Sequence, residues 1–187
     1  MKTRDLAYIA LFAAITAVLG LVPAIAVGPV PVTAQTLGVM LAGAILGARR
    51  AFLSQLLFLV LVAVGLPLLA SGAGGLSVFA GPTAGYLFAW PVAAFVTGLL
   101  TERFWARYDV VRGTVADVVG GIVVIYAIGV PVLVATSGLP WDKALWFGAA
   151  LFIPGDLIKA VLAAVIAVQV RRSYPVIERP QRAAALS

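Results

Sequence analysis

The fold is best inferred from the stretch Phe152-Ile153-Pro154-Gly155-Asp156-Leu157-Ile158-Lys159-Ala160. It places one carboxylate and one ammonium in a sequence that is otherwise almost entirely apolar. Asp156 and Lys159 are three residues apart, so on a helix they share a face. Charged side chains at membrane depth are costly and usually face a cavity or each other. The pair therefore indicates a polar site held by a membrane scaffold. The alternative is that Asp156 only caps a helix start and that Lys159 only extends toward the membrane surface.

The composition is typical of an integral membrane protein. Of the 187 residues, 63% are hydrophobic and 11% are charged, whereas a soluble domain carries about 25% charged residues. One hydrophobic core fits this length, so we expect a single membrane domain over residues 1–187. On such a protein the net charge of +6 indicates orientation in the bilayer rather than a nucleic-acid partner.

The chain contains neither cysteine nor histidine. This removes thiol nucleophiles, thiolate metal sites, and the commonest general base and metal ligand. We therefore expect no metal and no cofactor, and we do not expect an enzyme.

The apolar pattern predicts an all-α protein with six transmembrane helices. Their approximate ranges are 6–22, 36–46, 51–64, 83–100, 113–134 and 154–170, with a short helix at about 141–152. An unbroken helix from Trp141 to Arg171 would be about 46 Å long at 1.5 Å per residue, and the hydrocarbon core is about 30 Å thick. Pro154-Gly155 is the natural place for a break. Residues 1–22 resemble a signal peptide, but the long apolar run followed by Pro23 favours a retained first helix.

Two segments between the predicted helices have the composition of a ligand site. Residues 23–35 contain prolines that forbid continuous helix, and the segment leads into Thr33, Gln35 and Thr36, which either bind a polar ligand or cap the next helix. Residues 68–85 are uncharged and rich in glycine, including Gly74 and Gly75, which suggests close packing of backbone against a neighbour or a ligand. The segment contains no nucleotide-binding glycine motif. Tyr86 and Trp90 follow on one helical face, as an aromatic wall or, more usually, an interfacial belt.

The basic residues predict the orientation. With six spans and a cytoplasmic N-terminus, eleven of the thirteen Lys and Arg residues lie inside, which satisfies the positive-inside rule. They are Lys2, Arg4, Arg49, Arg50, Arg103, Arg107, Arg112, Arg171, Arg172, Arg179 and Arg182. Both termini are then cytoplasmic, and segments 23–35, 68–85 and the start of 154–170 converge on one external recess. Asp117, near the start of its helix, is interpreted as interfacial.

Such a recess suits a small ligand with polar ends and an apolar middle. Lys159 would bind a ligand carboxylate. Asp156 would accept a hydrogen bond from a ligand N–H or balance Lys159, and Tyr86 and Trp90 would pack on apolar rings.

Three motifs resemble those of a known family. They are Pro31-Val32-Thr33-Ala34-Gln35-Thr36, Gly81-Pro82-Thr83-Ala84-Gly85-Tyr86 and Pro154-Gly155-Asp156-Leu157-Ile158-Lys159-Ala160. Their order and spacing resemble the BioY family, the biotin-binding S components of energy-coupling factor (ECF) transporters, over roughly residues 6–172. The resemblance implies a six-helix S-component fold in a bacterial or archaeal cytoplasmic membrane, an external biotin site that includes Tyr86, Asp156 and Lys159, and a lid formed by the glycine-rich loop. The wider set of candidate ligand residues adds Thr83, Gln35, Thr33, Gly74, Gly75 and Trp90.

The same resemblance implies protein partners. The chain has no Walker motif, so it does not hydrolyse ATP itself, and the family implies a transmembrane coupling subunit and two ATPase subunits. An alanine motif on the first helix of S components meets the coupling subunit. Small residues four apart let another helix approach closely; Ala10 and Ala14 are the candidates, and the offset pair Ala13 and Ala17 competes.

Two other classes of protein are alternatives. An ion-coupled secondary transporter of a small vitamin-like molecule would use Asp156 and Asp117 as proton or ion sites, but it would normally show internal repeats, and no convincing repeat is found. A membrane enzyme would need a catalytic constellation, and the Asp156–Lys159 pair lacks a nucleophile. Tight stoichiometric binding without turnover favours an S component, whereas ion-dependent flux by the purified chain favours the secondary transporter.

Overall fold

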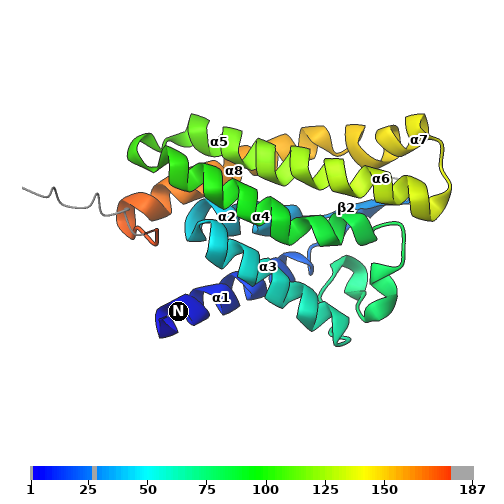
Figure 1. The fold of residues 1–187 in the computed structure, drawn as a ribbon, viewed down its shortest axis with the longest axis horizontal. Coiled ribbons are helices and arrows are strands. Elements are labelled where there is room, and N and C mark those ends of the chain that lie inside the picture. Colours follow the sequence, from blue (N-terminus) through cyan, green and yellow to red (C-terminus); the bar gives the residue numbers. More distant parts are fainter. Residues whose placement is uncertain (1, 27–28, 178–187) are drawn as a thin grey trace, which may run out of the picture.

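Helices account for nearly all regular structure, because in lipid every backbone group of a segment must be bonded and a helix achieves this internally. The computed structural model describes residues 2–26 and 29–177. The main helices in these residues are α1 (Thr3–Leu19), α2 (Gln35–Leu46), α3 (Ala48–Ala63), α4 (Ala84–Phe104), α5 (Val110–Val118), α6 (Ile125–Ser137), α7 (Trp141–Leu145) and α8 (Ile153–Ser173). Figure 1 shows their arrangement. The predicted all-α class is confirmed.

Shorter elements connect the helices. The strands β1 (Ile25–Ala26) and β2 (Pro31–Val32) form one antiparallel pair. Short 3₁₀ turns are η1 (Ala70–Gly72), η2 (Leu76–Phe79) and η3 (Trp105–Arg107), and π-helical segments are η4 (Val119–Val124) and η5 (Trp146–Ala150). The last two join helices end to end, so α5–η4–α6 and α7–η5–α8 each make one long helical rod. Counted in this way, the described residues form six helical rods.

Three of these rods are long and apolar enough to cross a membrane. They are Ala84–Arg107, Val110–Ser137 and Trp141–Ser173, and α2 is a shorter apolar helix. The third rod is the one for which a break was expected at Pro154. The structure replaces the sharp break with π-helical geometry and a turn at 151–152, after which α8 begins at Ile153.

Several helices extend a few residues beyond the predicted ranges because side chains cap their ends. The backbone N–H of Lys2 donates to Asp5 Oδ2 at 2.9 Å, so α1 begins at Thr3. Asp109 Oδ1 accepts from the Arg112 N–H at 2.8 Å, so α5 begins at Val110. Satisfying the free N–H groups of the first turn is what allows a helix to start there.

Close helix packing in the centre depends on small residues. α4 packs against α2, α3, α6 and η4, and α2 is enclosed on nearly all sides. At Gly98, an added Cβ would lie 2.5 Å from the Gly47 carbonyl carbon and 2.6 Å from Ala48 Cα. The α2–α3 turn therefore rests directly on the backbone of α4.

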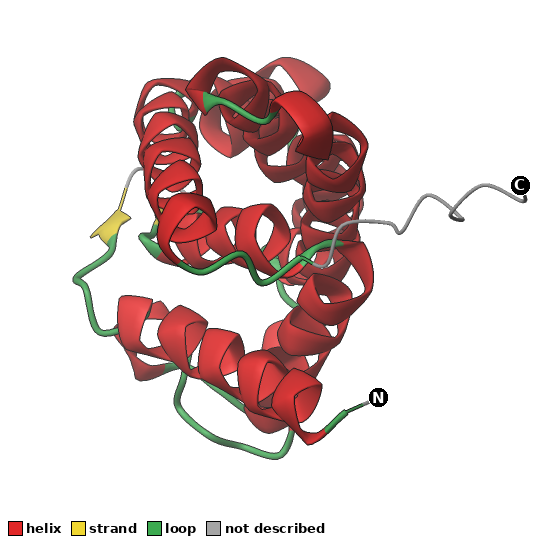
Figure 2. Cartoon of the chain, turned by 90° about the vertical axis from the view of Figure 1, so that its left-hand side faces the viewer, coloured by secondary structure: helices red, strands yellow, loops and turns green. Residues whose placement is uncertain are grey.

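The two ends of the bundle differ in chemistry. The start of α1, the α2–α3 turn and the end of α8 meet at one end (Figures 1 and 2), where Arg50 contacts Asp5 at 3.4 Å and donates to the Val176 carbonyl at 3.1 Å. The β1–β2 pair, η1, η2 and α7 lie at the other end. Arg50 at the α2–α3 turn and Arg171 and Arg172 at the end of α8 thus lie away from the Asp156–Lys159 pair at the start of α8.

We predict that Gly98→Ala destabilises the bundle by about 1–3 kcal/mol, because a methyl group there collides with backbone that cannot rotate away. The measurement is the unfolding transition of the purified chain in detergent. Gly155→Ala is the matched control, since nothing lies within 4 Å of a Cβ at that helical position. Equal stability of the two variants would contradict this account of α3–α4 packing.

Candidate ligand-binding site

A cavity of about 230 Å³ lies at the end of the bundle opposite the basic residues. Residues 30–36, the loop between α3 and α4, the first turns of α4 and the polar face of α8 all contribute to its wall. The three segments predicted to converge therefore lie around one cavity. Apart from Asp156 and Lys159, its walls carry uncharged side chains, most of them apolar.

Asp156 and Lys159 form the polar pole of this cavity. Lys159 Nζ lies 2.8 Å from Asp156 Oδ1 and also donates to the Thr33 carbonyl at 2.6 Å and to Thr36 Oγ1 at 3.0 Å. Asp156 is only 4% exposed. The three N–H donors of the ammonium thus have three protein partners. Lys159 is directed into the protein rather than toward the membrane surface.

Tyr126 completes the pole and was not anticipated from the sequence. Its hydroxyl donates to Asp156 Oδ2, while Thr36 Oγ1 donates to Oδ1 at 3.2 Å. Among the described residues, Oδ1 thus accepts from both Thr36 and Lys159, whereas Oδ2 accepts only from Tyr126. Because a carboxylate oxygen can accept two hydrogen bonds, Oδ2 can accept one more. A signal for Tyr126 existed: it is the one side chain with a polar atom between Asp117 and Thr136.

Tyr86 and Trp90 form an interior wall of the cavity rather than an interfacial belt. Both are buried and line the cavity together with Thr83. The Tyr86 hydroxyl donates to the Gly148 carbonyl at 2.8 Å, and the Trp90 ring packs 5.6 Å from that of Phe58. The Tyr86 hydroxyl is thus satisfied by α7–α8, and its ring face is what remains for a ligand.

Gln35 holds the loop between α3 and α4, which lines the cavity. Its amide nitrogen donates to the carbonyls of Thr16 at 3.1 Å and Leu68 at 3.0 Å, and its oxygen accepts from the Ala70 N–H at 3.0 Å. The side chain lines the cavity, but both amide hydrogens have protein partners. Thr33 likewise lines the cavity, and its carbonyl is the one that holds Lys159.

Gly74 and Gly75 do not line the cavity, so the geometry does not support their predicted place at a ligand. The Gly75 N–H donates to the Val62 carbonyl at 2.8 Å, and a Cβ at Gly74 would collide with the Leu66 backbone. Gly75 also has φ +87°, a conformation that favours glycine. The two glycines fold the loop back onto the end of α3. The loop residues that reach the cavity are Leu69, Ala70, Ala73, Val78 and Gly81.

The first helix presents one of its two alanine pairs outward. Ala10 and Ala14 are exposed, whereas Ala13 is 3% exposed and Ala17 is partly covered by the protein's own bundle. Ala7, Leu11 and Val18 are also exposed and continue the outward face. A second helix could therefore approach the Ala10–Ala14 side.

Asp117 is buried, and the interfacial interpretation of this residue is wrong. Its side chain is 0% exposed, and neither carboxylate oxygen has a hydrogen-bond partner among the described residues. The hydroxyls of Thr101 and Tyr108 are also buried nearby. Burial, followed by the charge of Asp117, raises the pKa of the Tyr108 phenol above its usual range. Because α5 is apolar on most sides, its sequence does not show which face turns inward and therefore does not predict that Asp117 is buried.

Comparisons with known proteins give one consistent result. The model of the BioY family matches residues 1–176. A biotin transporter BioY of Rhizobium etli is 50% identical, with 98% of this chain and 100% of the relative covered. One of Rhodobacter capsulatus is 46% identical, with 92% and 95% covered. The solved S component for biotin from an ECF-type ABC transporter superposes with a TM-score of 0.86 at 32% identity, covering 92% of this chain and 95% of that chain.

We predict that Asp117→Asn raises the stability of the purified chain, because it removes an ionisable group that is buried without a partner. Asp156→Asn is the matched control and should lower stability by roughly 1–3 kcal/mol, because its oxygens have three donors. Thermal unfolding in detergent measures both. A loss of stability in Asp117→Asn equal to that in Asp156→Asn would show that Asp117 is paired.

Proposed function

The chain belongs to the BioY family, and on that premise we propose that it binds biotin with high affinity and serves as the substrate-binding subunit of an ECF-type ABC transporter. The observation that carries the proposal is the cavity with one charged pole and apolar walls. Biotin has a ureido ring at one end, a carboxylate at the other, and a thioether ring and alkyl chain between them. No covalent chemistry is required of the site.

The geometry of the pole favours the ureido ring over the carboxylate. A ureido group presents N–H donors beside a carbonyl acceptor. Asp156 and Lys159 present an acceptor beside a donor, with 2.8 Å between them. A ligand carboxylate placed on Lys159 would also meet the Asp156 carboxylate, and like charges at that distance repel. The proposal therefore reverses the expectation that Lys159 binds the ligand carboxylate.

The proposed contacts require Lys159 to exchange one of its hydrogen-bond partners. Asp156 Oδ2 accepts a ureido N–H in the direction that Tyr126 leaves free. Lys159 turns one N–H from the Thr33 carbonyl to the ureido oxygen. The thioether ring and alkyl chain then lie along Tyr86, Leu87 and Trp90, which line the apolar wall. The loop held by Gln35 covers the ligand.

Uptake requires partners that this chain does not contain. We infer that the exposed Ala10–Ala14 face of α1 receives a helix of a transmembrane coupling subunit, which associates with two ATPase subunits. The clustering of basic residues at the opposite end from the cavity supports an external cavity with both termini in the cytoplasm of a bacterial or archaeal cell.

We predict one biotin site per chain, with binding weakened about 5- to 150-fold in Lys159→Ala and Asp156→Asn, the equivalent of roughly 1–3 kcal/mol. Isothermal titration of the detergent-solubilised chain measures this. Lys143→Ala is the matched control, because that lysine is exposed and lies outside the cavity. Full-strength binding by both site variants would refute the site, and absence of biotin binding by folded wild type would refute the substrate.

We also predict that Ala14→Trp abolishes biotin uptake by cells that contain the coupling and ATPase subunits, while leaving biotin binding by the purified chain unchanged. The bulky ring prevents close helix approach at an exposed position. Val165→Trp, on the exposed face of α8, is the control and should retain uptake. Normal uptake and co-purification of the partners with Ala14→Trp would place the partner interface elsewhere.

A further inference from the structure

A second pocket lies at the basic end of the bundle, away from the ligand cavity. It has a volume of about 530 Å³ and is lined by Trp105 and Tyr108 at the α4–α5 corner and by Arg171 and Arg172 at the end of α8, with Val168 and Ile177 among its apolar walls. Neither the proposed biotin site nor the α1 face involves these residues. We refer to it as the Arg171 pocket.

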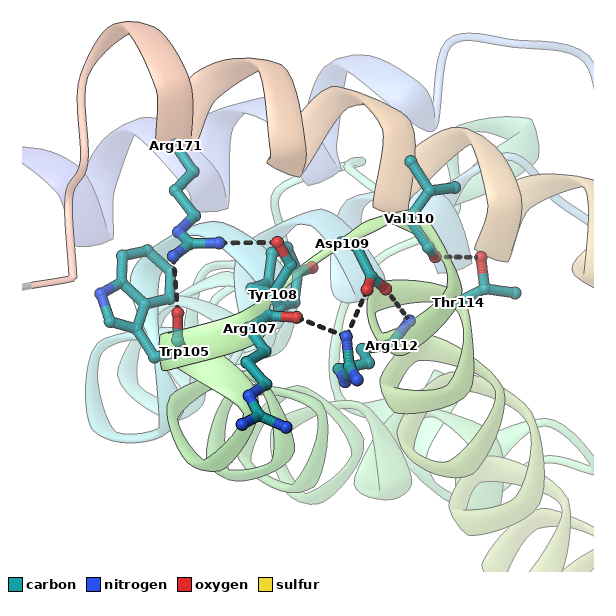
Figure 3. Close-up of polar contacts among 8 residues, drawn as sticks. All are labelled: Trp105, Arg107, Tyr108, Asp109, Val110, Arg112, Thr114 and Arg171. Carbon is teal, nitrogen blue, oxygen red and sulfur yellow. Dashed lines mark hydrogen bonds and ion pairs between the residues drawn. The ribbon is translucent and has the colours of Figure 1, made fainter.

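Arg171 is held in a fixed position in this pocket. Its Nη1 donates to the Tyr108 carbonyl and its Nη2 to the Trp105 carbonyl, both at 2.6 Å. The guanidinium carbon lies 4.7 Å from the centroid of the Trp105 ring and 5.8 Å from that of Tyr108. Figure 3 shows the side chain between the two carbonyls. Carbonyls do not neutralise the cation, and further N–H donors of the guanidinium remain available.

The pocket has an excess of positive charge. Neither Arg171 nor Arg172 has a carboxylate within ion-pair distance in residues 2–26 and 29–177. Two acidic groups of this corner have other partners: Asp109 pairs with Arg112, and Glu102 accepts from the Ala48 N–H at 2.8 Å (Figure 3 shows the first pair). A third, Asp117, is buried near Tyr108 and forms no ion pair with Arg171 or Arg172. A fixed cation beside a second arginine, with neither paired to a carboxylate of the described residues, attracts an anion.

The depth of the pocket identifies the class of anion. Arg107 ends one rod that is long and apolar enough to cross a membrane, and Ser173 ends another. We therefore place the pocket near the boundary of the hydrocarbon, where lipid headgroups lie. Arginine and aromatic side chains are common at this level, and basic pockets between helices on the cytoplasmic side bind anionic headgroups. The walls from Val168 and Ile177 suit the apolar part of a lipid that continues from its phosphate.

We propose that the Arg171 pocket binds the phosphate headgroup of an anionic phospholipid. Arg171 and Arg172 contact the phosphate, Trp105 stacks on the Arg171 guanidinium, and the acyl chains run along the end of α8. The site is independent of the biotin assignment.

Native mass spectrometry of the purified full chain tests the proposal. The chain is delipidated and then exposed to equal amounts of phosphatidylglycerol and phosphatidylcholine. Wild type should retain phosphatidylglycerol selectively. Retention should fall roughly fivefold in Arg172→Gln and roughly thirtyfold in the double variant Arg171→Gln/Arg172→Gln, at about 1 kcal/mol for each arginine near the membrane surface.

One control variant and one check of folding accompany the test. Arg112→Gln removes a neighbouring arginine that is already paired with Asp109 and does not line the pocket, and it should retain the lipid. Arg172→Gln removes an exposed side chain, so its fold, checked by thermal unfolding, should be intact even where the double variant is not. Equal retention of the two lipids, or unchanged retention in a folded Arg172→Gln variant, would overturn the proposal.

A competition experiment distinguishes a lipid phosphate from free inorganic phosphate. Inorganic phosphate at millimolar concentration should not displace phosphatidylglycerol, because the lipid also has its apolar contacts. Displacement would show a site for a free anion and would overturn the assignment to lipid. Binding of an acidic peptide from a coupling subunit in place of the lipid would overturn it too.

Discussion

The ion pair between Asp156 and Lys159 is the interaction on which the rest of the structure depends. Two opposite charges buried in an apolar bundle are tolerable only when each has the other and when hydrogen bonds satisfy the remaining atoms. Those bonds come from Thr36 on α2, Tyr126 on α6 and the carbonyl of Thr33. The pair on α8 therefore fixes how three segments far apart in the sequence meet. It also leaves one carboxylate direction and one exchangeable ammonium bond for a ligand.

The ligand cavity and the cluster of arginines lie at opposite ends of the helix bundle. At one end Gln35 makes two hydrogen bonds to the loop between α3 and α4 and a third to α1, so this part of the cavity wall is held through backbone groups rather than by further charges. At the other end arginines collect, and the small residues of α4 let the α2–α3 turn sit directly against it. Between the two ends Asp117 remains buried without a partner in the described residues. That unpaired carboxyl group opposes stability, because burying a polar group without a hydrogen bond costs free energy.

Much of this could be predicted from the sequence. The apolar runs predict the helices, and the isolated Asp156 and Lys159 predict the polar pole, because a charge in an apolar helix usually faces a cavity or another charge.

The remaining features depend on how each helix is rotated about its axis and on the path of each loop, which the sequence pattern does not determine. The sequence does not predict the role of Tyr126, because one tyrosine in an apolar run does not reveal which way it faces. Its position near a helix start predicts an interfacial Asp117. Glycine content alone does not show whether Gly74 and Gly75 approach a ligand or fold the loop back on its own helix. Gln35 lines the cavity, but its role in fastening the loop depends on carbonyls of Thr16 and Leu68 that no local pattern brings together.

The central claim is that the Asp156–Lys159 pair recognises the ureido ring rather than the carboxylate. The most direct measurement compares the binding of biotin and of biotinamide, whose carboxylate is replaced by a neutral amide, to wild type and to Lys159→Ala. If the pair binds the ureido ring, the substitution weakens both ligands by the same factor, because both carry that ring. If Lys159→Ala weakens biotin but leaves biotinamide unchanged, Lys159 binds the carboxylate and the account of the site is wrong.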